Sequence, residues 1–239
     1  WRLKEIIKKY SDHITLPIVM KKTDFKDGNT VKTNEDEVIN DASAIWTRNK
    51  KDIKAKEYEE FYKSLTFDME APLAHFHNRV EGTQEYTSLL FIPSKAPFDL
   101  YERERNQGIK LYVKRIFIME ANEKLMPQYL RFIKGVIDSN DLPLNVSREI
   151  LQDSKQVETI KSGSVKKILS ALEDMSKKKP DEYKKFWSQF GRVLKEGPSE
   201  DSGNREKIAS LLKFSSTHDS TDEESVSLED YVGRMKTEQ

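Results

Sequence analysis

The chain has 239 residues, and its 41 lysines and arginines balance 41 aspartates and glutamates to a formal net charge of zero. This balance argues against a protein built mainly to bind nucleic acid or anionic lipid, because such proteins carry a marked basic excess. Cysteine is absent, which excludes disulfides, thiolate metal sites and cysteine nucleophiles. With no apolar run near about eighteen residues and no signal-peptide pattern, we expect a cytoplasmic protein without a membrane span.

The first third of the chain mixes helical and β patterns. Residues 1–13 carry apolar side chains at helical spacing, whereas residues 15–20 have a β-like pattern. The sequence of residues 26–29, Lys-Asp-Gly-Asn, is typical of a hairpin turn. A short apolar stretch at residues 44–48 lies between polar flanks, and residues 53–67 predict an amphipathic helix.

The strongest β patterns lie in the middle of the chain. Residues 86–92 and 109–119 are rich in β-branched and aromatic residues, and each segment predicts one strand. Both segments have apolar residues in both side-chain phases, as expected for central strands covered on two faces. The charged residues 101–108 predict a solvated connection. Residues 123–137 fit either a helix that begins at Pro127 or a short turn followed by a strand.

After Ser147 the pattern is wholly helical. Pro180 near a helix start and the Gly197-Pro198 pair at its end delimit one of these helices. Asn204 is a plausible N-cap of another helix. Residues 215–227 are rich in serine, threonine and acids and predict a loop, and residues 227–230 resemble a capping box that begins a last helix. Apolar stripes at helical spacing predict the core positions of this region: Val165, Ile168, Leu169, Leu172, Met175, Tyr183, Phe186, Trp187, Phe190, Val193, Leu194, Ile208, Leu211 and Leu212.

Most signatures of independent catalysis are missing. The nine glycines form neither a dinucleotide-binding motif nor a phosphate-binding P-loop, and no Gly-x-Ser-x-Gly elbow occurs. His75 and His77 have a spacing that suits a metal on a strand, but with no third ligand evident we interpret them as polar loop histidines and expect no metal. The lysine clusters at 166–167 and 177–179 are interpreted as solvated helix faces. Trp187 could line a ligand groove, but its helical spacing favours core packing.

Residues 138–153 contain the best candidate site. A polar loop ends at Ser147, a good N-cap, and a helix is expected to begin at Arg148. An arginine in a first helical turn, beside free backbone N–H groups, suits contact with an external anion. Gln152 lies on roughly the same helix face, and Asn145 in the loop could add amide hydrogen bonds. The alternative is that Arg148 pairs at the surface with a carboxylate of its own helix, Glu149 or Asp153.

Several long motifs carry a resemblance that covers essentially the whole chain. The sequence Leu142-Pro-Leu-Asn-Val-Ser-Arg-Glu-Ile-Leu-Gln152 closely resembles a signature of the heat shock protein 90 chaperone family. The segment Leu90-Phe-Ile-Pro-Ser-Lys-Ala-Pro-Phe-Asp-Leu100 is similar to another signature of that family. Trp46-Thr-Arg-Asn49 and His77-Asn-Arg-Val-Glu-Gly82 resemble its bacterial form, and the similarity to the family continues through Phe186-Trp187-Ser-Gln-Phe-Gly191.

The resemblance implies the middle domain of a dimeric, ATP-driven chaperone of the stress response. The implied fold is α/β: a three-layer α-β-α domain with a mixed sheet, followed by a small all-helical coil. Residues 1–14 would connect to an N-terminal nucleotide-binding domain, residues 15–155 would form the large α/β domain with a catalytic loop, and residues 156–239 a helical array. ATP and Mg²⁺ would act in the full-length protein, and this segment would bind neither tightly and would not hydrolyse ATP alone.

The resemblance also assigns individual residues. Arg148 matches a catalytic-loop arginine that reaches the γ-phosphate of ATP held by the N-terminal domain, and Gln152 and Asn145 match its polar partners. Trp46 matches a tryptophan associated with client contact, although a buried anchor of the sheet is an equal alternative. Phe117 matches a residue that supports docking of the N-terminal domain, but it shares a strand phase with Val113 and Arg115, so a core role is equally open.

The implied partners are the protein's own N-terminal domain, unfolded or partly folded clients, and a second copy of the full-length protein. We expect the present segment to be a monomer and to bind no nucleic acid and no membrane. The alternative function is a non-catalytic scaffold for protein–protein interactions.

Overall fold

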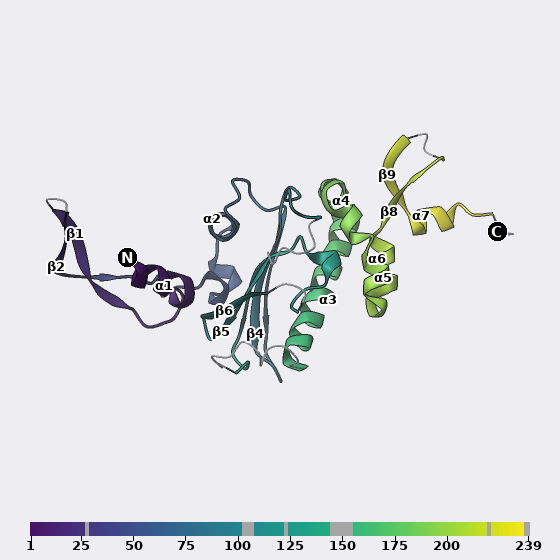
Figure 1. The fold of residues 1–239 in the computed structure, drawn as a ribbon. Helices are drawn as coiled ribbons and strands as arrows, with labels where there is room; N and C mark the ends of the chain where they lie inside the picture. The colour runs from purple at the N-terminus through teal and green to yellow at the C-terminus, as the bar shows by residue number, and fades with distance from the viewer. Residues whose placement is uncertain (27–28, 102–107, 122–123, 144–154, 219–220, 237–239) are drawn as a thin grey trace.

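The computed structural model describes residues 1–26, 29–101, 108–121, 124–143, 155–218 and 221–236. The described elements form an elongated arrangement with a five-stranded sheet in the middle (Figure 1). The N-terminal helix and a hairpin lie at one end of the molecule, and helices cover the opposite side of the sheet. A second hairpin and the C-terminal helix lie at the other end, so the two termini are far apart.

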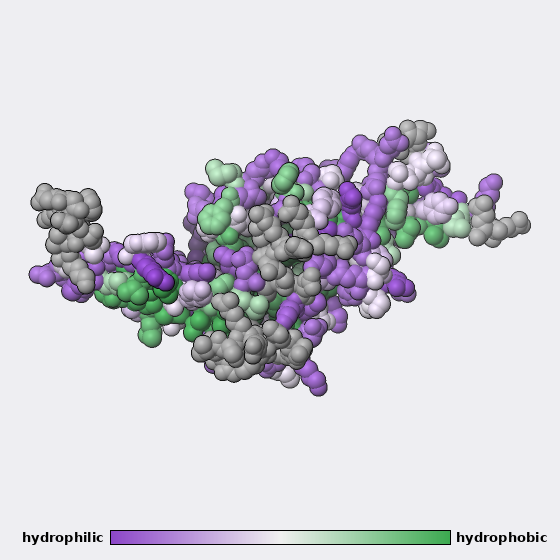
Figure 2. Space-filling model, viewed as in Figure 1, coloured by the Kyte–Doolittle hydropathy of each residue, from purple (hydrophilic) through white to green (hydrophobic). Residues whose placement is uncertain are grey.

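The N-terminal elements are α1 (Arg2–Ser11), β1 (Val19–Lys26) and β2 (Asn29–Val38). Strands β1 and β2 pair antiparallel with Lys26 opposite Asn29, which confirms the predicted hairpin. The buried Asn40 holds the base of this hairpin, because its side-chain oxygen accepts from the Ile18 N–H at 2.6 Å and its amide donates to the Leu16 carbonyl at 3.0 Å. Hydrophobic side chains over α1 are open to solvent (Figure 2).

The sheet and the elements beside it follow. They are η1 (Ile45–Thr47), η2 (Lys50–Asp52), α2 (Ala55–Thr66), β3 (Ala74–Val80), β4 (Tyr86–Ile92), β5 (Ile109–Val113), β6 (Ile116–Ala121), η3 (Gln128–Leu130) and β7 (Lys134–Ser139). The strand order is β3-β4-β7-β5-β6, in which β7 runs parallel to β5 and antiparallel to β4. The sheet is therefore mixed, as predicted.

The C-terminal part begins with a long helix. Its elements are α3 (Lys155–Lys178), α4 (Pro180–Leu194), α5 (Gly197–Glu200), η5 (Ser202–Asn204), α6 (Arg205–Leu211), β8 (Lys213–Ser216), β9 (Thr221–Ser227) and α7 (Leu228–Gly233). The predicted apolar stripes are buried. The capping box is confirmed, because the Ser227 hydroxyl accepts from the Asp230 N–H at 3.0 Å and the Asp230 carboxylate accepts from the Ser227 N–H at 2.9 Å. Asn204 precedes α6 as predicted, but its amide donates to Asp201 instead of its oxygen capping the helix.

Both faces of the sheet are buried, which makes three layers. Successive residues of a strand point to opposite faces, so Leu90 and Ile137 join the core beneath α3 and α4. Their neighbours Leu89 and Val136 join a second core with α2 and Trp46. The two-phase apolar pattern thus predicted the burial of β4 and β5 correctly, whereas β6, the second half of residues 109–119, is a half-buried edge strand. The α-β-α architecture is confirmed.

The structure contradicts one prediction for the β region and decides between two alternatives for another. Residues 109–119 are not one strand: β5 and β6 form a hairpin whose turn residues, Lys114 and Arg115, have φ of 50° and 66°. Two such residues in a row reverse the chain, and the neighbouring end of β7 holds the turn, since the Lys114 N–H donates to the Ser139 carbonyl at 3.0 Å. For residues 123–137 the turn-and-strand alternative is correct, because only the 3₁₀ turn η3 precedes β7.

The prediction of a loop at residues 215–227 was wrong, because β8 and β9 form an antiparallel hairpin there. The acidic composition suggested a solvated loop. In the structure, acids of β9 instead contact lysines and a tryptophan in α4 or directly after it. Glu224 accepts from the Trp187 Nε1–H at 2.9 Å and pairs with Lys195 at 2.6 Å. Val226 of β9 is buried. The region after α3 is therefore mainly helical but not wholly so.

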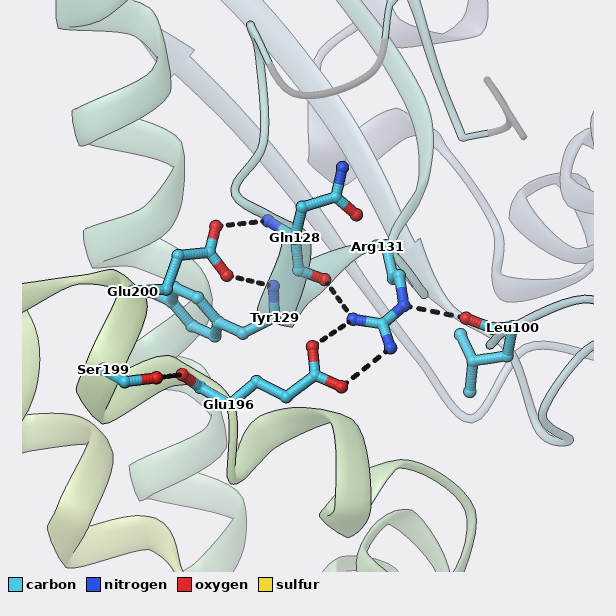
Figure 3. A network of polar contacts seen from close by, with 7 residues as sticks. All are labelled: Leu100, Gln128, Tyr129, Arg131, Glu196, Ser199 and Glu200. Carbon is cyan, nitrogen blue, oxygen red and sulfur yellow. Dashed lines mark hydrogen bonds and ion pairs between the residues drawn. The ribbon is translucent and has the colours of Figure 1, made fainter. Parts of the chain in front are cut away.

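A polar network joins η3 and the residue after it to α5 and the residue before it (Figure 3). The Arg131 guanidinium forms two hydrogen bonds with the Glu196 carboxylate, at 2.6 and 2.9 Å, and its Nε donates to the Leu100 carbonyl at 2.7 Å. Glu200 accepts from the backbone N–H groups of the first two residues of η3, at 2.6 and 2.9 Å. Paired hydrogen bonds of this kind fix orientation as well as distance, so η3 and the start of α5 hold a defined geometry.

We predict that Gly135→Ala strongly destabilises the fold. Gly135 has φ of 147°, and a Cβ there would lie 2.2 Å from the Leu89 carbonyl oxygen. This oxygen belongs to the backbone of β4, which is paired on both edges and has little freedom to shift. Strain and overpacking together are expected to cost roughly 4 kcal/mol or more in the free energy of unfolding. The measurement is urea unfolding followed by circular dichroism.

The matched control is Gly82→Ala, because Gly82 has a similar φ of 151° but nothing within 4 Å of the added Cβ. It should lose only the strain, about 1–3 kcal/mol. Equal losses for the two variants would contradict the assigned close approach of β7 to β4.

Candidate functional site

The predicted catalytic-loop residues Asn145, Arg148 and Gln152 lie outside the described residues, within 144–154. The described chain brackets this segment. Strand β7 ends at Ser139 before it, and helix α3 begins at Lys155 after it. Strand β7 and helix α3 are therefore the elements to which the two ends of this segment are attached.

The chain that leads into the segment is held by a polar turn. The Ser139 hydroxyl accepts from the Asp141 N–H at 3.3 Å and from the Leu142 N–H at 3.2 Å. The Asp141 carboxylate accepts from the Glu85 N–H at 2.5 Å, and the Asn140 N–H donates to the Glu85 carbonyl at 3.0 Å. Leu142 is buried. These bonds attach residues 139–142 to the chain between β3 and β4.

The chain that leaves the segment is held by packing. Val157 and Ile160, in the first turns of α3, are buried in the core on the helical face of the sheet. Gly163 lies so close to Tyr86 that an added Cβ would be 2.5 Å from the tyrosine hydroxyl. Tyr86 also pairs with Ser139 across the sheet. The elements on both sides of residues 144–154 therefore pack at the same end of the sheet.

Trp46 is buried, with 1% of its surface exposed. Its Nε1–H donates to the Asp138 carboxylate at 2.9 Å, and its ring lies 4.7 Å from the His13 ring and 5.0 Å from the Tyr112 ring between centroids. The side chain therefore anchors the η1 segment to the end of β7. Its expected contact with clients stays a prediction, and in this structure the ring is covered by its neighbours.

His77 supports Trp46 from β3. Its Nε2 lies 2.8 Å from the Trp46 carbonyl, which can only accept, so Nε2 carries the proton. Its Nδ1 therefore accepts from the Tyr58 hydroxyl, at 2.8 Å. His75 stacks on the Tyr58 ring at 4.2 Å between centroids.

The interpretation of His75 and His77 as polar loop histidines was wrong, because both lie in β3 and His77 is buried. Burial lowers the pKa of His77, and it lowers the pKa of His75 as well. No group of three possible metal ligands occurs among the residues that the structure describes.

Asp138 is a buried carboxylate for which the sequence predicted no role. One oxygen accepts from Trp46, and the other accepts from the Arg115 N–H at 3.1 Å. Burial raises the pKa of Asp138, whereas these two hydrogen bonds and the nearby Arg115 and His13 lower it. The sequence signal for this structural role was the position of Asp138, which ends an apolar run and directly precedes the polar loop.

Phe117 lies on β6 beneath α1. Its ring lies 5.8 Å from the Tyr10 ring and 5.7 Å from the Tyr112 ring, and the side chain is half-buried. The expected shared phase with Val113 and Arg115 was wrong, because the β5–β6 turn separates them and Tyr112 is the cross-strand partner. Phe117 thus contacts the helix that was expected to connect to a preceding domain, and its docking role stays a prediction.

The remaining candidates have structural roles. Lys166 and Lys167 are exposed on α3, and Lys177 pairs with Glu173 at 2.6 Å, as expected for a solvated helix face. Trp187 is buried in the core, which confirms its predicted packing. Within the described chain no helix is long and apolar enough to cross a bilayer.

Comparisons with known proteins agree on one family. The family model described as Hsp90 protein matches residues 22–239. The chain is 61% identical to the chaperone protein HtpG of Dechloromonas aromatica over 236 residues, which are 99% of this chain and 37% of that protein. It is 60% identical to HtpG of Chromobacterium violaceum over 238 residues, 99% of this chain and 38% of the relative. The chain thus spans little more than a third of these relatives.

A solved structure supports the same assignment. The middle domain of a Plasmodium falciparum heat shock protein matches with a TM-score of 0.72 and 34% identity, covering 82% of this chain and 76% of that one. The agreement in fold and sequence places the described sheet and helices in the architecture of that domain.

The buried His77 predicts a pH-dependent stability. Because the folded pKa of His77 is lowered, its stabilising contribution is present above the unfolded pKa of about 6.5 and is lost as the pH falls through the folded value. We expect His77→Gln to lower stability at pH 7.5 and to flatten the loss of stability below about pH 6.5. Urea unfolding at a series of pH values measures this.

The control is Asn78→Ala, a non-titrating neighbour on β3, which should leave the pH dependence unchanged. If His77→Gln showed the same pH dependence as the unmodified chain, the assigned neutral, buried histidine would be wrong.

Proposed function

The chain belongs to the Hsp90 family of chaperones, and from this membership we propose that it is the middle segment of an ATP-dependent chaperone. In the proposed mechanism ATP is held by a separate N-terminal domain of the full-length protein. Arg148 of this chain then reaches the γ-phosphate when the two domains dock. We also propose that domain boundaries lie near residues 14 and 155.

The way in which the two ends of residues 144–154 are attached supports the proposal. Residues 144–154 connect a buried, hydrogen-bonded strand end to a helix whose first turns are packed in the core. A catalytic arginine gains most when rigid elements fix the ends of its segment, because little conformational entropy is then lost on reaching the phosphate. The hydrogen bonds of Ser139 and Asp141 and the burial of Leu142 provide such an attachment.

Charge neutralisation is the chemical role of Arg148. Negative charge lies on the oxygens of the transferred phosphoryl group, and a fixed guanidinium stabilises it by hydrogen bonds and Coulomb attraction. Gln152 and Asn145 would orient the arginine or the phosphate oxygens through their amides. A comparable arginine in GTPases changes the rate by about 10³–10⁵, which is a ceiling for the effect here.

ATP and Mg²⁺ would be held outside this chain. The sequence has no glycine-rich phosphate loop, and the described residues gather no set of three carboxylate or imidazole ligands. These residues do not fit a Mg²⁺ site, and we propose that the N-terminal domain holds the ion together with ATP.

Docking and client binding complete the proposal. We propose that the N-terminal domain docks beside Phe117, which α1 already contacts, and that α1 is the connection between the domains. Clients would contact the η1 segment around Trp46, where Arg48 is exposed beside the buried indole. The full-length protein is proposed to be a cytoplasmic homodimer, and this segment alone a monomer.

A second candidate function is a non-catalytic scaffold. It is favoured by large apolar side chains that the structure leaves exposed, namely Phe67, Met69 and Phe98. Exposed apolar patches commonly mark sites of protein–protein contact. A pure scaffold would bind unfolded clients equally well as an isolated chain and within the full-length protein, whereas the chaperone proposal requires ATP to change that affinity.

We expect Arg148→Ala in the full-length protein to lower the kcat of ATP hydrolysis by about tenfold or more, with the affinity for ATP kept, because the arginine acts on charge at the γ-phosphate. Arg148→Lys should recover only part of the rate, since lysine keeps the charge but lacks the planar pair of donors. Steady-state turnover and equilibrium nucleotide titration provide the two readouts.

The control is Arg79→Ala, which removes an exposed arginine of β3 and should leave turnover unchanged. Unchanged turnover in Arg148→Ala would overturn the proposed role of the arginine.

We also expect the isolated 239-residue chain to release no phosphate from ATP, since the nucleotide pocket would lie in another domain. A coupled phosphate assay with the full-length protein as positive control measures this. Turnover by the isolated chain at a comparable rate would contradict the division of labour between the domains.

A further inference from the structure

A hollow opens on the face of the sheet that α2 covers, at the end where β5 and β7 begin and β4 ends. Its volume is about 710 Å³, which is within the usual range for ligand pockets. The last turn of α2, the loop after β4 and the strands β5, β6 and β7 supply its lining. Because Ser139 lies at the opposite end of β7, the hollow is separate from the candidate site.

Two lysines of the sheet line this hollow. Lys110 of β5 lies opposite Val136 of β7, and Lys134 precedes Val136 by two residues, so all three side chains are on the same face. Among the residues that the structure describes, the ammonium groups of Lys110 and Lys134 have neither an ion pair nor a hydrogen bond. Two like charges on neighbouring strands repel each other, and a negative group between them stabilises both.

Lys134 is half-buried on the sheet side of the hollow. Burial lowers the pKa of Lys134, whereas the negative charges of Asp99 and Glu120 raise it. An ammonium group that loses water without gaining a close partner costs free energy. An anion bound in the hollow would remove that cost.

The other charged groups that line the hollow have partners or face the solvent. Lys95 pairs with Glu70, and Asp68 accepts from the Tyr62 hydroxyl at 2.9 Å. Glu120 of β6 is exposed. Because Asp68 and Glu120 are close by, a ligand with a single negative charge fits the hollow better than a phosphate dianion.

Apolar side chains form the walls of the hollow. Leu65, Pro93 and Pro97 line it, and so does Phe67, whose side chain is 87% exposed. Phe67 ends α2 at φ of 59°, in the left-handed region that glycine usually occupies at a helix end. A phenylalanine in this conformation is strained, and no packing in the fold compensates for its exposed ring. A ligand with an apolar group beside its charge would cover this ring.

We propose that this hollow binds a carboxylate that carries an apolar group: the carboxylate lies between Lys110 and Lys134, and the apolar group packs against the prolines and the Phe67 ring. Two sources have this chemistry, namely an acidic residue beside apolar ones in a peptide, and a free organic acid. The exposed rings of Phe67 and Phe98 favour the peptide, because they extend the apolar surface beyond the hollow. This site does not depend on the role proposed for Arg148.

The test uses the full-length protein and two probes. One probe is a fluorescent hexapeptide with blocked ends and a single glutamate between leucine and phenylalanine, and the other is free phenylacetate. We expect the glutamate peptide to bind about tenfold more tightly than the same peptide with glutamine, as is typical of hydrogen bonds to a charged group. Fluorescence anisotropy measures the binding of the peptides, and competition with the glutamate peptide measures that of phenylacetate.

Lys110→Met and Lys134→Met each remove one charge and keep an unbranched apolar side chain, so each is expected to weaken binding of the glutamate peptide by about tenfold. Phe67→Gly removes the exposed ring and relieves the backbone strain, and it should weaken peptide binding without loss of stability. Lys167→Met, which changes an exposed lysine of α3, is the matched control and should keep the affinity. Circular dichroism verifies that each variant is folded.

Equal affinity for the glutamate and glutamine peptides would overturn the peptide as the ligand, and this comparison needs no variant to fold. The site itself is overturned if neither probe binds, or if the binding of both probes is unchanged in the folded lysine variants. Displacement of the peptide by phenylacetate that depends on Lys134 supports a site open to free organic acids, whereas a bound peptide that phenylacetate does not displace supports a site for polypeptides. ATP turnover should be unchanged in all these variants, so failure of this site leaves the proposed function of Arg148 standing.

Discussion

Strand β7 must be buried on both faces and paired on both edges, and the rest of the fold depends on this constraint. It pairs with β4 on one side and with β5 on the other, and its side chains alternate between the two cores. The close approach at Gly135 leaves no space for a side chain between β7 and β4. Each neighbouring element is placed relative to this strand, including α3 on one face and α2 with Trp46 on the other.

The same constraint explains why polar chemistry gathers where β7 ends. A buried strand must satisfy its polar groups as it leaves the core, because an unpaired buried donor or acceptor is costly. Asp138, Ser139 and Asp141 meet this need by bonding to three different parts of the chain. The described chain therefore approaches residue 144 from a defined point, which suits the role proposed for Arg148.

Much of the fold could be predicted from periodicity, and the failures have specific causes. The two-phase apolar pattern of residues 86–92 correctly indicated a strand buried on both faces. The β5–β6 turn was missed because Lys114 and Arg115 are not typical residues for positive φ, and tertiary bonds from β7 hold them there. The hairpin at residues 213–227 was missed because its acids are paired with α4 and its neighbours, which composition cannot reveal. Asp138 was passed over for a similar reason, since its donors come from distant positions.

In the proposed function, Arg148 of this chain contacts ATP held by another domain. The most direct measurement is a structure of the full-length protein with a non-hydrolysable ATP analogue. We expect the Arg148 guanidinium to lie within hydrogen-bonding distance of a γ-phosphate oxygen, about 3 Å, with residues 139–142 in the turn described above. A closed, nucleotide-bound structure in which Arg148 pairs instead with Glu149 or Asp153, and a different cation contacts the γ-phosphate, would contradict it.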